Sequence, residues 1–261
     1  MALGALLEVM RRLRDPRAGC PWDRQQDFRD IAPYTLEEAY EVYDAIEAGD
    51  RARLRDELGD LLFQVVFLSQ IACERGAFDF ADVAAAVTDK LVRRHPHVFA
   101  AESAPMPEDA EAQRANWEAL KAAERAREGR EGALAGIARA LPALTRAAKL
   151  GQRAARVGFD WSDVGGVRAK VLEEWQELTE AASDSRQRER CGEEFGDLLF
   201  ALTQYARHLG IDAEAALRAA NRKFETRFAA MEQQLRESGR ELDTLSPDDW
   251  DRLWNTVKGI G

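Results

Sequence analysis

The stretch that decides the fold is EEAYEVYDAIEAGDRARLRDELGDLLFQV, residues 37–65. On a helix, residues three or four positions apart share a face, so Glu38 lies beside Glu41, and Glu57 lies beside Asp60. The short connector EAGDRAR between the two pairs predicts two antiparallel helices. Leucine, phenylalanine and valine side chains next to the second pair supply an inward-packing face. We therefore predict a helical hairpin on which four carboxylates converge.

Carboxylates held close together either raise one another's pKa or bind a cation, because partial burial removes the water that would screen them. A ligand set made only of oxygen suits Mg²⁺, which keeps several waters and binds few carboxylates together with substrate phosphates. Acidic residues on a helix surface more often only solvate it. The stretch alone therefore leaves two interpretations, a divalent-metal site and a solvated face.

The same pattern occurs again in residues 170–202, KVLEEWQELTEAASDSRQRERCGEEFGDLLFAL. Both copies read EExxE, a short gap and ExxD, followed by Leu-Leu-Phe. The second-copy acids that match the first four are Glu174, Glu177, Glu194 and Asp197. Acids at matching positions in both copies favour the metal site over the solvated face.

A nearly constant offset extends this match over most of the chain. It is 137 positions from Trp22 to Phe159 and again from Trp117 to Trp254, which indicates a duplicated domain. Three glycines punctuate EGREGALAG, where we place the boundary. We predict an N-terminal domain at residues 1–128, a linker at 129–136 and a C-terminal domain at 137–261.

Composition favours helices throughout the chain. Of its 261 residues, 46% are apolar and 32% are charged. Helix-forming residues are abundant, and the alternating β-branched runs typical of strands are almost absent. Each copy is interpreted as a leading basic helix, a turn, the EExxE helix, the ExxD helix and one or two more helices. The predicted fold class is all-α, with tandem helical bundles.

Charge and cysteine content exclude several kinds of protein. Lys and Arg number 37 against 47 Asp and Glu, and the net charge of −10 argues against nucleic acid as a partner. Three cysteines without CxxC spacing indicate neither a disulfide framework nor a zinc site. No stretch approaches the about 20 apolar residues of a membrane span, and the chain start does not read as a signal peptide. We expect a soluble, cytoplasmic protein with no membrane partner.

Positively charged residues in the second copy are candidates for binding the phosphates of a ligand. Lys223 and Arg227 lie four apart with Asn221 beside them, and Trp254 and Lys258 form a similar pair. Cations facing a bound metal would bind a polyphosphate, although such pairs alone also occur on solvated surfaces. Corresponding pairs recur in the first copy, Lys90 with Arg94 and Trp117 with Lys121.

Glycines interrupt both ExxD helices, at Gly59 and Gly196. A glycine inside a helix costs roughly 1 kcal/mol relative to alanine. We therefore expect a close approach at both positions, by a packed helix or by a ligand.

Several motifs together resemble a known family. They are CPWD at residues 20–23, RRHPHVF at 93–99, VGFDW at 157–161 and the doubled EExxE with ExxD. In combination they resemble the MazG nucleoside triphosphate pyrophosphohydrolases in their two-domain bacterial form, over nearly the full chain. The resemblance implies an all-α fold of the MazG and dimeric dUTPase kind, a homodimer, and Mg²⁺ as cofactor with Mn²⁺ able to substitute. It also implies hydrolysis of NTPs or dNTPs between the α and β phosphates, giving a monophosphate and pyrophosphate, with clearance of aberrant nucleotides as one role.

Carried onto this sequence, the resemblance implies a role for each site residue. The metal ligands would be Glu38, Glu41, Glu57 and Asp60 in the first copy and Glu174, Glu177, Glu194 and Asp197 in the second. The nucleotide, ATP among others, would be bound by Lys170, Asn221, Lys223, Arg227, Trp254 and Lys258. A bound metal would lower the pKa of a water, and Glu37 or Glu173, the first acid of each EExxE, would orient or deprotonate it. The catalytic set would be Glu173 with the four second-copy ligands.

The two copies differ where phosphate would bind. In the first copy Pro96 ends the helix soon after Arg94, and Thr88 stands in the place of Asn221. We therefore predict that the second copy is the main catalytic unit.

Other functions stay open beside this one. A dedicated dUTPase or a phosphoribosyl-ATP pyrophosphohydrolase would share the acidic motif, and a non-enzymatic helical regulatory module would carry the acids only as a solvated face. A di-iron carboxylate bundle needs Glu-x-x-His pairs. No histidine of the chain follows a glutamate by three positions, which argues against that class.

Overall fold

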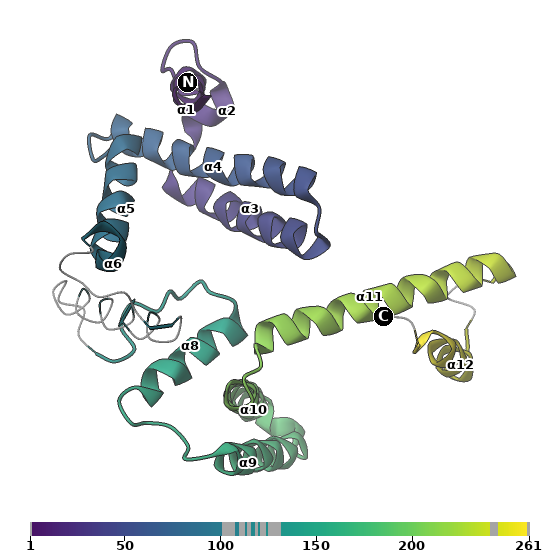
Figure 1. Cartoon of the computed structure of the whole chain (residues 1–261). Coiled ribbons are helices and arrows are strands. Elements are labelled where there is room, and N and C mark those ends of the chain that lie inside the picture. Colours follow the sequence, from purple (N-terminus) through teal and green to yellow (C-terminus); the bar gives the residue numbers. More distant parts are fainter. Residues whose placement is uncertain are drawn as a thin grey trace. The chain divides into compact units, whose positions relative to one another are not determined.

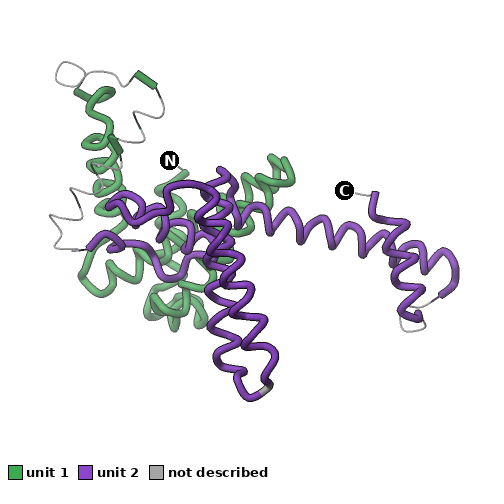
Figure 2. The backbone as a smooth tube through the Cα atoms, turned by 90° about the horizontal axis from the view of Figure 1, so that it is seen from below, with its two compact units in different colours: residues 1–120 green, residues 121–261 purple. Residues whose placement is uncertain are grey.

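The computed structural model describes residues 2–100, 108–109, 113, 116–117, 120, 124, 132–240 and 245–259. Among these residues every regular element is a helix and none is a strand (Figure 1), which confirms the all-α prediction. The chain divides into two compact units, residues 1–120 and 121–261 (Figure 2). The predicted linker at 129–136 falls partly outside the described residues, so the proposed domain boundaries stay a prediction.

Unit 1 is built on a hairpin of two long helices. Its helices are α1 (Ala2–Leu13), α2 (Pro21–Gln25), α3 (Phe28–Ala48), α4 (Arg51–Glu74), α5 (Phe80–Arg94) and α6 (Pro96–Phe99). The predicted hairpin is α3 with α4, which pack along each other, and α1 packs on α4. The core lies between α1, α3 and α4, where the buried cluster is Met10, Ile31, Val66, Phe67 and Ile71.

Local signals set the ends of the α3–α4 hairpin. Asp27 caps the start of α3 in a capping box with Asp30, and Gly49, with φ of 67°, ends the helix in the left-handed conformation. The next residue, Asp50, already caps α4 by accepting backbone N–H bonds from Ala52 and Arg53. Because only Gly49 and Asp50 separate the two helices, α3 and α4 must run antiparallel, as predicted.

Unit 2 repeats this plan with a longer extension. Its elements are α8 (Ala143–Ala155), α9 (Val164–Ala182), η1 (Ser185–Gln187), α10 (Arg188–His208), α11 (Ala213–Ser238) and α12 (Pro247–Val257). The hairpin is α9 with α10, and α8 takes the place of α1. Helix α11 has 26 residues where α5 has 15, since the chain reaches Pro96 just after α5 ends. Within the described ranges, no helix is both long and apolar enough to cross a membrane.

The two units fill the place between the first helix and the hairpin differently. In unit 1 the Arg14 guanidinium lies 5.3 Å from the Phe67 ring centre and pairs with Glu74 at 2.7 Å. The corresponding residues of unit 2, 137 positions on, are Gly151 and Gln204. A Cβ at Gly151 would lie 1.7 Å from the Gln204 amide oxygen. The fully buried Gln204 therefore occupies space that the missing side chain leaves free.

Gly151→Ala should therefore lower the free energy of unfolding by about 1.5 kcal/mol, because the new methyl group displaces a buried amide. The displaced Gln204 would lose the bond that its Nε2 donates to the Ala147 carbonyl at 2.9 Å. Denaturant unfolding followed by circular dichroism measures the change. Gly192→Ala in α10 is the matched control, since nothing lies within 4 Å of its new Cβ, and it should stabilise by up to about 1 kcal/mol. Equal stabilities of Gly151→Ala and the wild type would contradict the packing described here.

Candidate functional site

The α9–α10 hairpin brings together three of the predicted metal ligands. Glu174 from α9 is only 5% exposed, and carboxylate oxygens of Glu174, Glu194 and Asp197 all lie within 4.8 Å of one another. Glu177 lies one turn beyond Glu174 and outside this group of three. Loss of surrounding water raises the pKa of Glu177, and the negative charges of Glu194 and Glu174 raise it further. The charges of the group thus act on Glu177, whose place as the fourth ligand stays a prediction.

The α3–α4 hairpin gathers a different set of three. Oxygens of Glu38, Glu41 and Glu57, all half-buried, lie within 4.8 Å of one another. Asp60 lies outside this group. Burial raises the pKa of Glu38, and the charges of Asp60 and Glu41 add to the shift. Both donor sets consist only of carboxylate oxygens, which fits a hard divalent cation such as Mg²⁺.

Each acidic group contains an arginine that the sequence analysis missed. Arg53 pairs with Glu57 at 2.9 Å, and Arg190 pairs with Glu194 at 3.2 Å. Each arginine precedes its glutamate by four residues, and the two arginines stand at matching positions of the two copies. This i, i+4 spacing, present twice, was the signal that could have identified them. In each unit one carboxylate of the group is therefore already partly neutralised.

Lys170 adds a second cation to unit 2 only. Its Nζ lies 2.7 Å from a Glu174 oxygen and 2.9 Å from a Glu173 oxygen. Hydrogen bonds to Glu173 and Glu174 raise the pKa of Lys170, so the side chain is firmly cationic. Tyr34 occupies the corresponding position in unit 1, four residues before Glu38. The cation that resemblance assigned to nucleotide binding thus lies directly against the acids in one copy and is missing from the other.

A second group of predicted site residues lies on α11 and α12. Arg227 donates from Nη2 to the Lys258 carbonyl at 2.6 Å, and its guanidinium lies 6.0 Å from the centre of a Trp254 ring. Asn221 and Lys223 are exposed on α11. The structure thus joins Arg227, Trp254 and Lys258 with one another, and Lys170 with the acids.

Aromatic side chains hold α12 on α11. Phe224 lies 5.6 Å from Trp254 between ring centres, and Phe228 stacks on Trp250 at 6.3 Å. In unit 1 the place of Phe228, at the offset of 133 found for this segment, belongs to His95. There the ring of Trp117 lies 6.2 Å from His95 instead. The tryptophan contact is thus kept in both copies with a different partner.

The remaining predicted residues of unit 1 are the counterparts of the residues predicted to bind the nucleotide in unit 2. Lys90 is exposed and Arg94 is half-buried on α5, which ends at Arg94. Lys121 lies outside the described residues. The close approach expected at Gly59 and Gly196 is not made by the described atoms, because nothing lies within 4 Å of a Cβ placed at either glycine.

Fold and site together define a tandem all-α protein with one carboxylate-lined helical hairpin in each half. The profile of the MazG nucleotide pyrophosphohydrolase domain matches residues 26–99 and again 166–230. The two matches contain the acids of both hairpins and together cover more than half of the chain. This chain belongs to the MazG family, and the resemblance found in the sequence is confirmed.

Known proteins match over nearly the whole chain. The chain is 52% identical over 254 residues to the "Nucleoside triphosphate pyrophosphohydrolase" of Escherichia coli (strain K12), covering 97% of this chain and 95% of that protein. It is 42% identical, over 97% of this chain and 94% of the relative, to the "Nucleoside triphosphate pyrophosphohydrolase/pyrophosphatase MazG" of Thermotoga maritima. It is also 41% identical to the "Uncharacterized protein YabN" of Bacillus subtilis (strain 168), over 96% of this chain and 50% of that protein. The tandem arrangement therefore occurs both at this length and within a longer chain.

Proposed function

We propose that this chain is a Mg²⁺-dependent nucleoside triphosphate pyrophosphohydrolase that cleaves NTPs or dNTPs between the α and β phosphates, with Mn²⁺ able to substitute. The observation that carries the proposal is the unit 2 site, where Lys170 lies 2.7 Å from Glu174 beside Glu194 and Asp197. Acids that hold a divalent cation and a lysine that binds phosphate are the two requirements of a triphosphate site. Two close relatives carry the corresponding activity in their names.

The residues of unit 2 would divide the work between metal and nucleotide. Glu174, Glu194 and Asp197 would hold the metal, with Glu177 completing the set. Bound Mg²⁺ would supply charge neutralisation for the triphosphate and activation of water. Glu173, which is exposed and bonded to Lys170, would orient the attacking water. Lys170 would turn from Glu174 to a phosphate oxygen once the metal neutralises that acid.

The nucleotide group on α11 and α12 would complete binding. Arg227 presents a planar guanidinium suited to bidentate contact with phosphate, and Lys258 adds a point charge. Asn221, Lys223 and Trp254 are the further contacts. Unit 2 is the main catalytic unit in this proposal, because unit 1 has Tyr34 in the place of Lys170 and a shorter helix in the place of α11.

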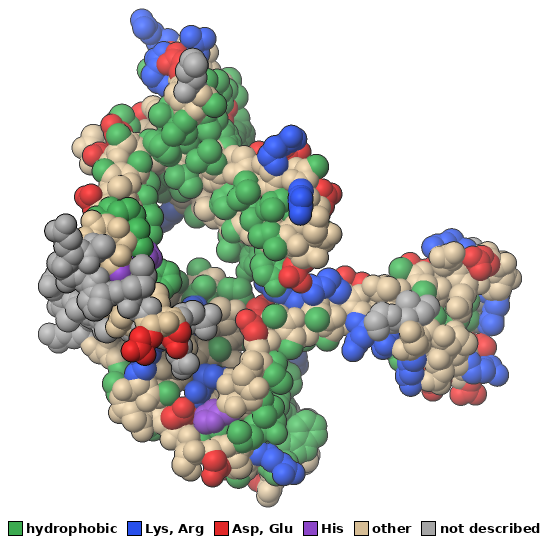
Figure 3. All heavy atoms as spheres, viewed as in Figure 1, with side chains coloured by type: hydrophobic (Ala, Val, Ile, Leu, Met, Phe, Trp, Pro, Cys, Tyr) green, Lys and Arg blue, Asp and Glu red, His purple; other side chains and the backbone are tan. Residues whose placement is uncertain are grey.

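Two copies of the chain would pair through the hairpins. Hydrophobic side chains reach the surface at many places on the face drawn in Figure 3. On the hairpins they recur at matching positions and are at least 39% exposed: Leu36 and Leu172, Leu58 and Phe195, and Leu62 and Leu199. Exposed apolar residues gathered in this way mark an interaction surface. Sedimentation equilibrium that gives the mass of one chain would contradict the homodimer.

Product analysis tests the proposed reaction. Incubated with Mg²⁺ and a panel of NTPs and dNTPs, the protein should release a nucleoside monophosphate and pyrophosphate. A diphosphate with inorganic phosphate would contradict the proposed bond. Activity confined to dUTP, or to phosphoribosyl-ATP, would identify one of the specialised relatives. No reaction with any nucleotide would favour the helical regulatory module. Cell fractionation would check the cytoplasmic location that belongs to this proposal.

A further inference from the structure

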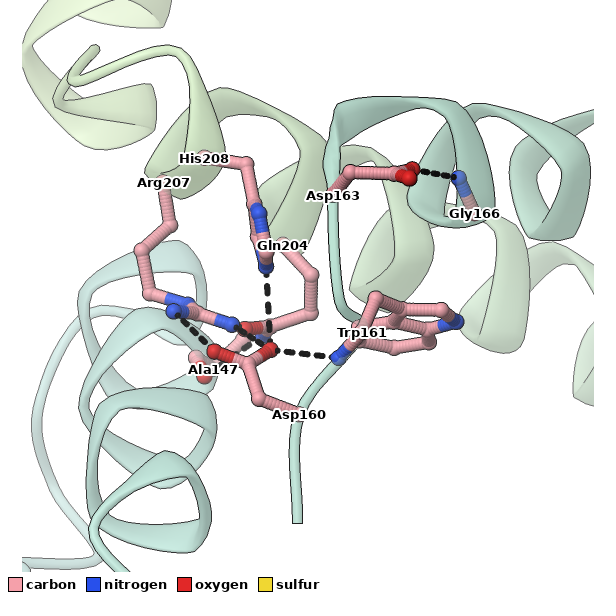
Figure 4. A network of polar contacts seen from close by, with 8 residues as sticks. All are labelled: Ala147, Asp160, Trp161, Asp163, Gly166, Gln204, Arg207 and His208. Atoms are coloured by element: carbon pink, nitrogen blue, oxygen red, sulfur yellow. Dashed lines mark hydrogen bonds and ion pairs between the residues drawn. The ribbon is translucent and has the colours of Figure 1, made fainter. Parts of the chain in front are cut away.

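The turn before α9 is fastened to the end of α10 through one carboxylate, that of Asp160 (Figure 4). Arg207 donates to both of its oxygens, from Nη2 at 2.6 Å and from Nη1 at 3.0 Å, and His208 Nε2 lies 2.9 Å from Oδ1. The backbone N–H of Trp161 donates to the same Oδ1 at 3.0 Å. The bonds from Arg207 hold the pKa of Asp160 well below its usual range. We call Asp160, Arg207 and His208 the α9 anchor.

The first turn of α9 needs support from outside the helix. It contains Gly165 and Gly166, and glycine is the weakest helix former after proline. Asp163 caps this turn by accepting the Gly166 N–H at 2.8 Å. Trp161 covers it, since a Cβ on Gly166 would lie 3.2 Å from the indole ring. The anchor thus binds the backbone N–H of Trp161, and the side chain of Trp161 packs on the glycine-containing turn.

Lys170 depends on this turn more than the acids do. It lies four residues after Gly166, about 6 Å along the helix axis. The buried residues of α9 are Val167, at the end of the first turn, and Glu174 and Ala181 farther along, so the helix is packed on both sides of Lys170. A shift of the first turn, with Val167 at its end, would therefore move Lys170 more than Glu174, which lies one turn farther from it.

Unit 1 lacks both the anchor and the lysine. The residues that correspond to Arg207 and His208 are Gln70 and Ile71, which cannot pair with a carboxylate in the same way. Arg14 holds that turn instead, by donating to the backbone carbonyls of Asp23 and Gln26. The side-chain anchor therefore occurs in the copy that has the lysine, and a backbone contact serves in the copy that does not.

We propose that the α9 anchor is a positioning group, which fixes the first turn of α9 and so holds Lys170 where it meets the phosphates of the substrate. The inference rests on the proposed function in one respect, the contact between Lys170 and the nucleotide. Among the described residues, the anchor makes no hydrogen bond or ion pair with the acids of the site. Its loss should therefore act mainly on the KM for nucleotide and much less on kcat.

Asp160→Asn tests the inference, because it keeps the shape of the side chain and removes its charge. The KM for ATP should rise about fivefold to tenfold, as for the loss of one charge-assisted hydrogen bond, with kcat changed less than about twofold. Arg207→Lys, which keeps the charge without the two-pronged contact, should give a smaller rise in KM. Asp184→Asn is the matched control. It breaks an Asp–Arg pair of similar geometry, Arg186–Asp184 at 3.0 Å, at the other end of the same hairpin. It should leave the KM unchanged.

A double-mutant cycle shows whether the anchor acts through the lysine. If it does, Asp160→Asn combined with Lys170→Ala should have the KM of Lys170→Ala alone. Additive effects on KM would overturn the inference, and so would a KM of Asp160→Asn equal to that of Asp184→Asn.

Hydrogen exchange keeps the test independent of the proposed activity. Backbone amides of residues 164–170 should exchange several times faster in Asp160→Asn than in the wild type or in Asp184→Asn. If the exchange rates of these amides do not change, the positioning role of the anchor is refuted, even if the enzyme is active. Faster exchange in a protein that releases no pyrophosphate from any nucleotide would refute the proposed function instead.

Discussion

Glu194→Ala should reduce pyrophosphate release from nucleoside triphosphates at least about a hundredfold, while Glu57→Ala should leave most of the activity. The two residues are matched partners, 137 positions apart. Each belongs to its unit's group of three carboxylates, and each pairs with an arginine four residues earlier. The first substitution removes a predicted metal ligand beside Lys170, and the second removes its counterpart in the unit that has Tyr34 instead. Rates measured at saturating Mg²⁺ and nucleotide compare them directly.

The matched design separates catalysis from folding. Both substitutions free an arginine on a helix of the same kind, so their effects on helix content and unfolding should be similar. Glu180→Ala, which removes an exposed acid of α9 whose side chain accepts a bond from Gln176, should leave the rate unchanged. Loss of activity in Glu57→Ala alone would move the catalytic site to unit 1. Equal losses in both would mean that the units act together.

Lys170→Met should lower the free energy of unfolding by about 2 kcal/mol in the presence of a chelator and by much less at saturating Mg²⁺. Without metal, Lys170 neutralises the buried Glu174 and the exposed Glu173. Removing one partner of a fully buried ion pair costs about 3–5 kcal/mol. The lysine side chain is 36% exposed, so solvent screening reduces the expected loss. A divalent cation held by Glu174, Glu194 and Asp197 would supply the missing positive charge.

Denaturant unfolding with and without Mg²⁺ measures this linkage between the lysine and the metal. Arg11→Met is the control, because Arg11 pairs with Glu8 on the surface of α1, a helix that carries none of the predicted metal ligands. Its small effect should be the same in both conditions. A loss of stability in Lys170→Met that Mg²⁺ does not restore would contradict a metal site at Glu174.

The hairpins could be predicted from the sequence because their signals are local and occur twice. Acids three apart, a two-residue reversal at Gly49 and Asp50 and a run of apolar residues all lie within one short stretch. The site was less predictable. Periodicity places Glu177 on the same face of α9 as Glu174, but it does not indicate that Glu174, Glu194 and Asp197 form the close group.

Contacts between distant segments could not be predicted from the sequence. Asp160 and Arg207 are 47 residues apart, and nothing in either neighbourhood indicates that a turn and a helix end meet there. The space at Gly151 could not be predicted for the same reason. From the sequence, a glycine inside a helix indicates only a locally weaker helix, whereas the structure shows that Gln204 fills the space beside Gly151. Such pairings depend on how helices pack, which single-residue propensity and spacing do not encode.

The different packing of the two units also bears on how the duplicated gene can change. Similar halves of a gene invite recombination, which would join the first helix of one copy to the hairpin of the other. One product would place Arg14 among unit 2 residues, where Ile211 stands in the place of Glu74 and Gln204 in the place of Phe67. A buried cation without its partner costs several kcal/mol. The reciprocal product would leave Gly151 facing Phe67 across an unfilled gap. Exchange between the halves would therefore yield unstable proteins, and the two copies are free to diverge in function.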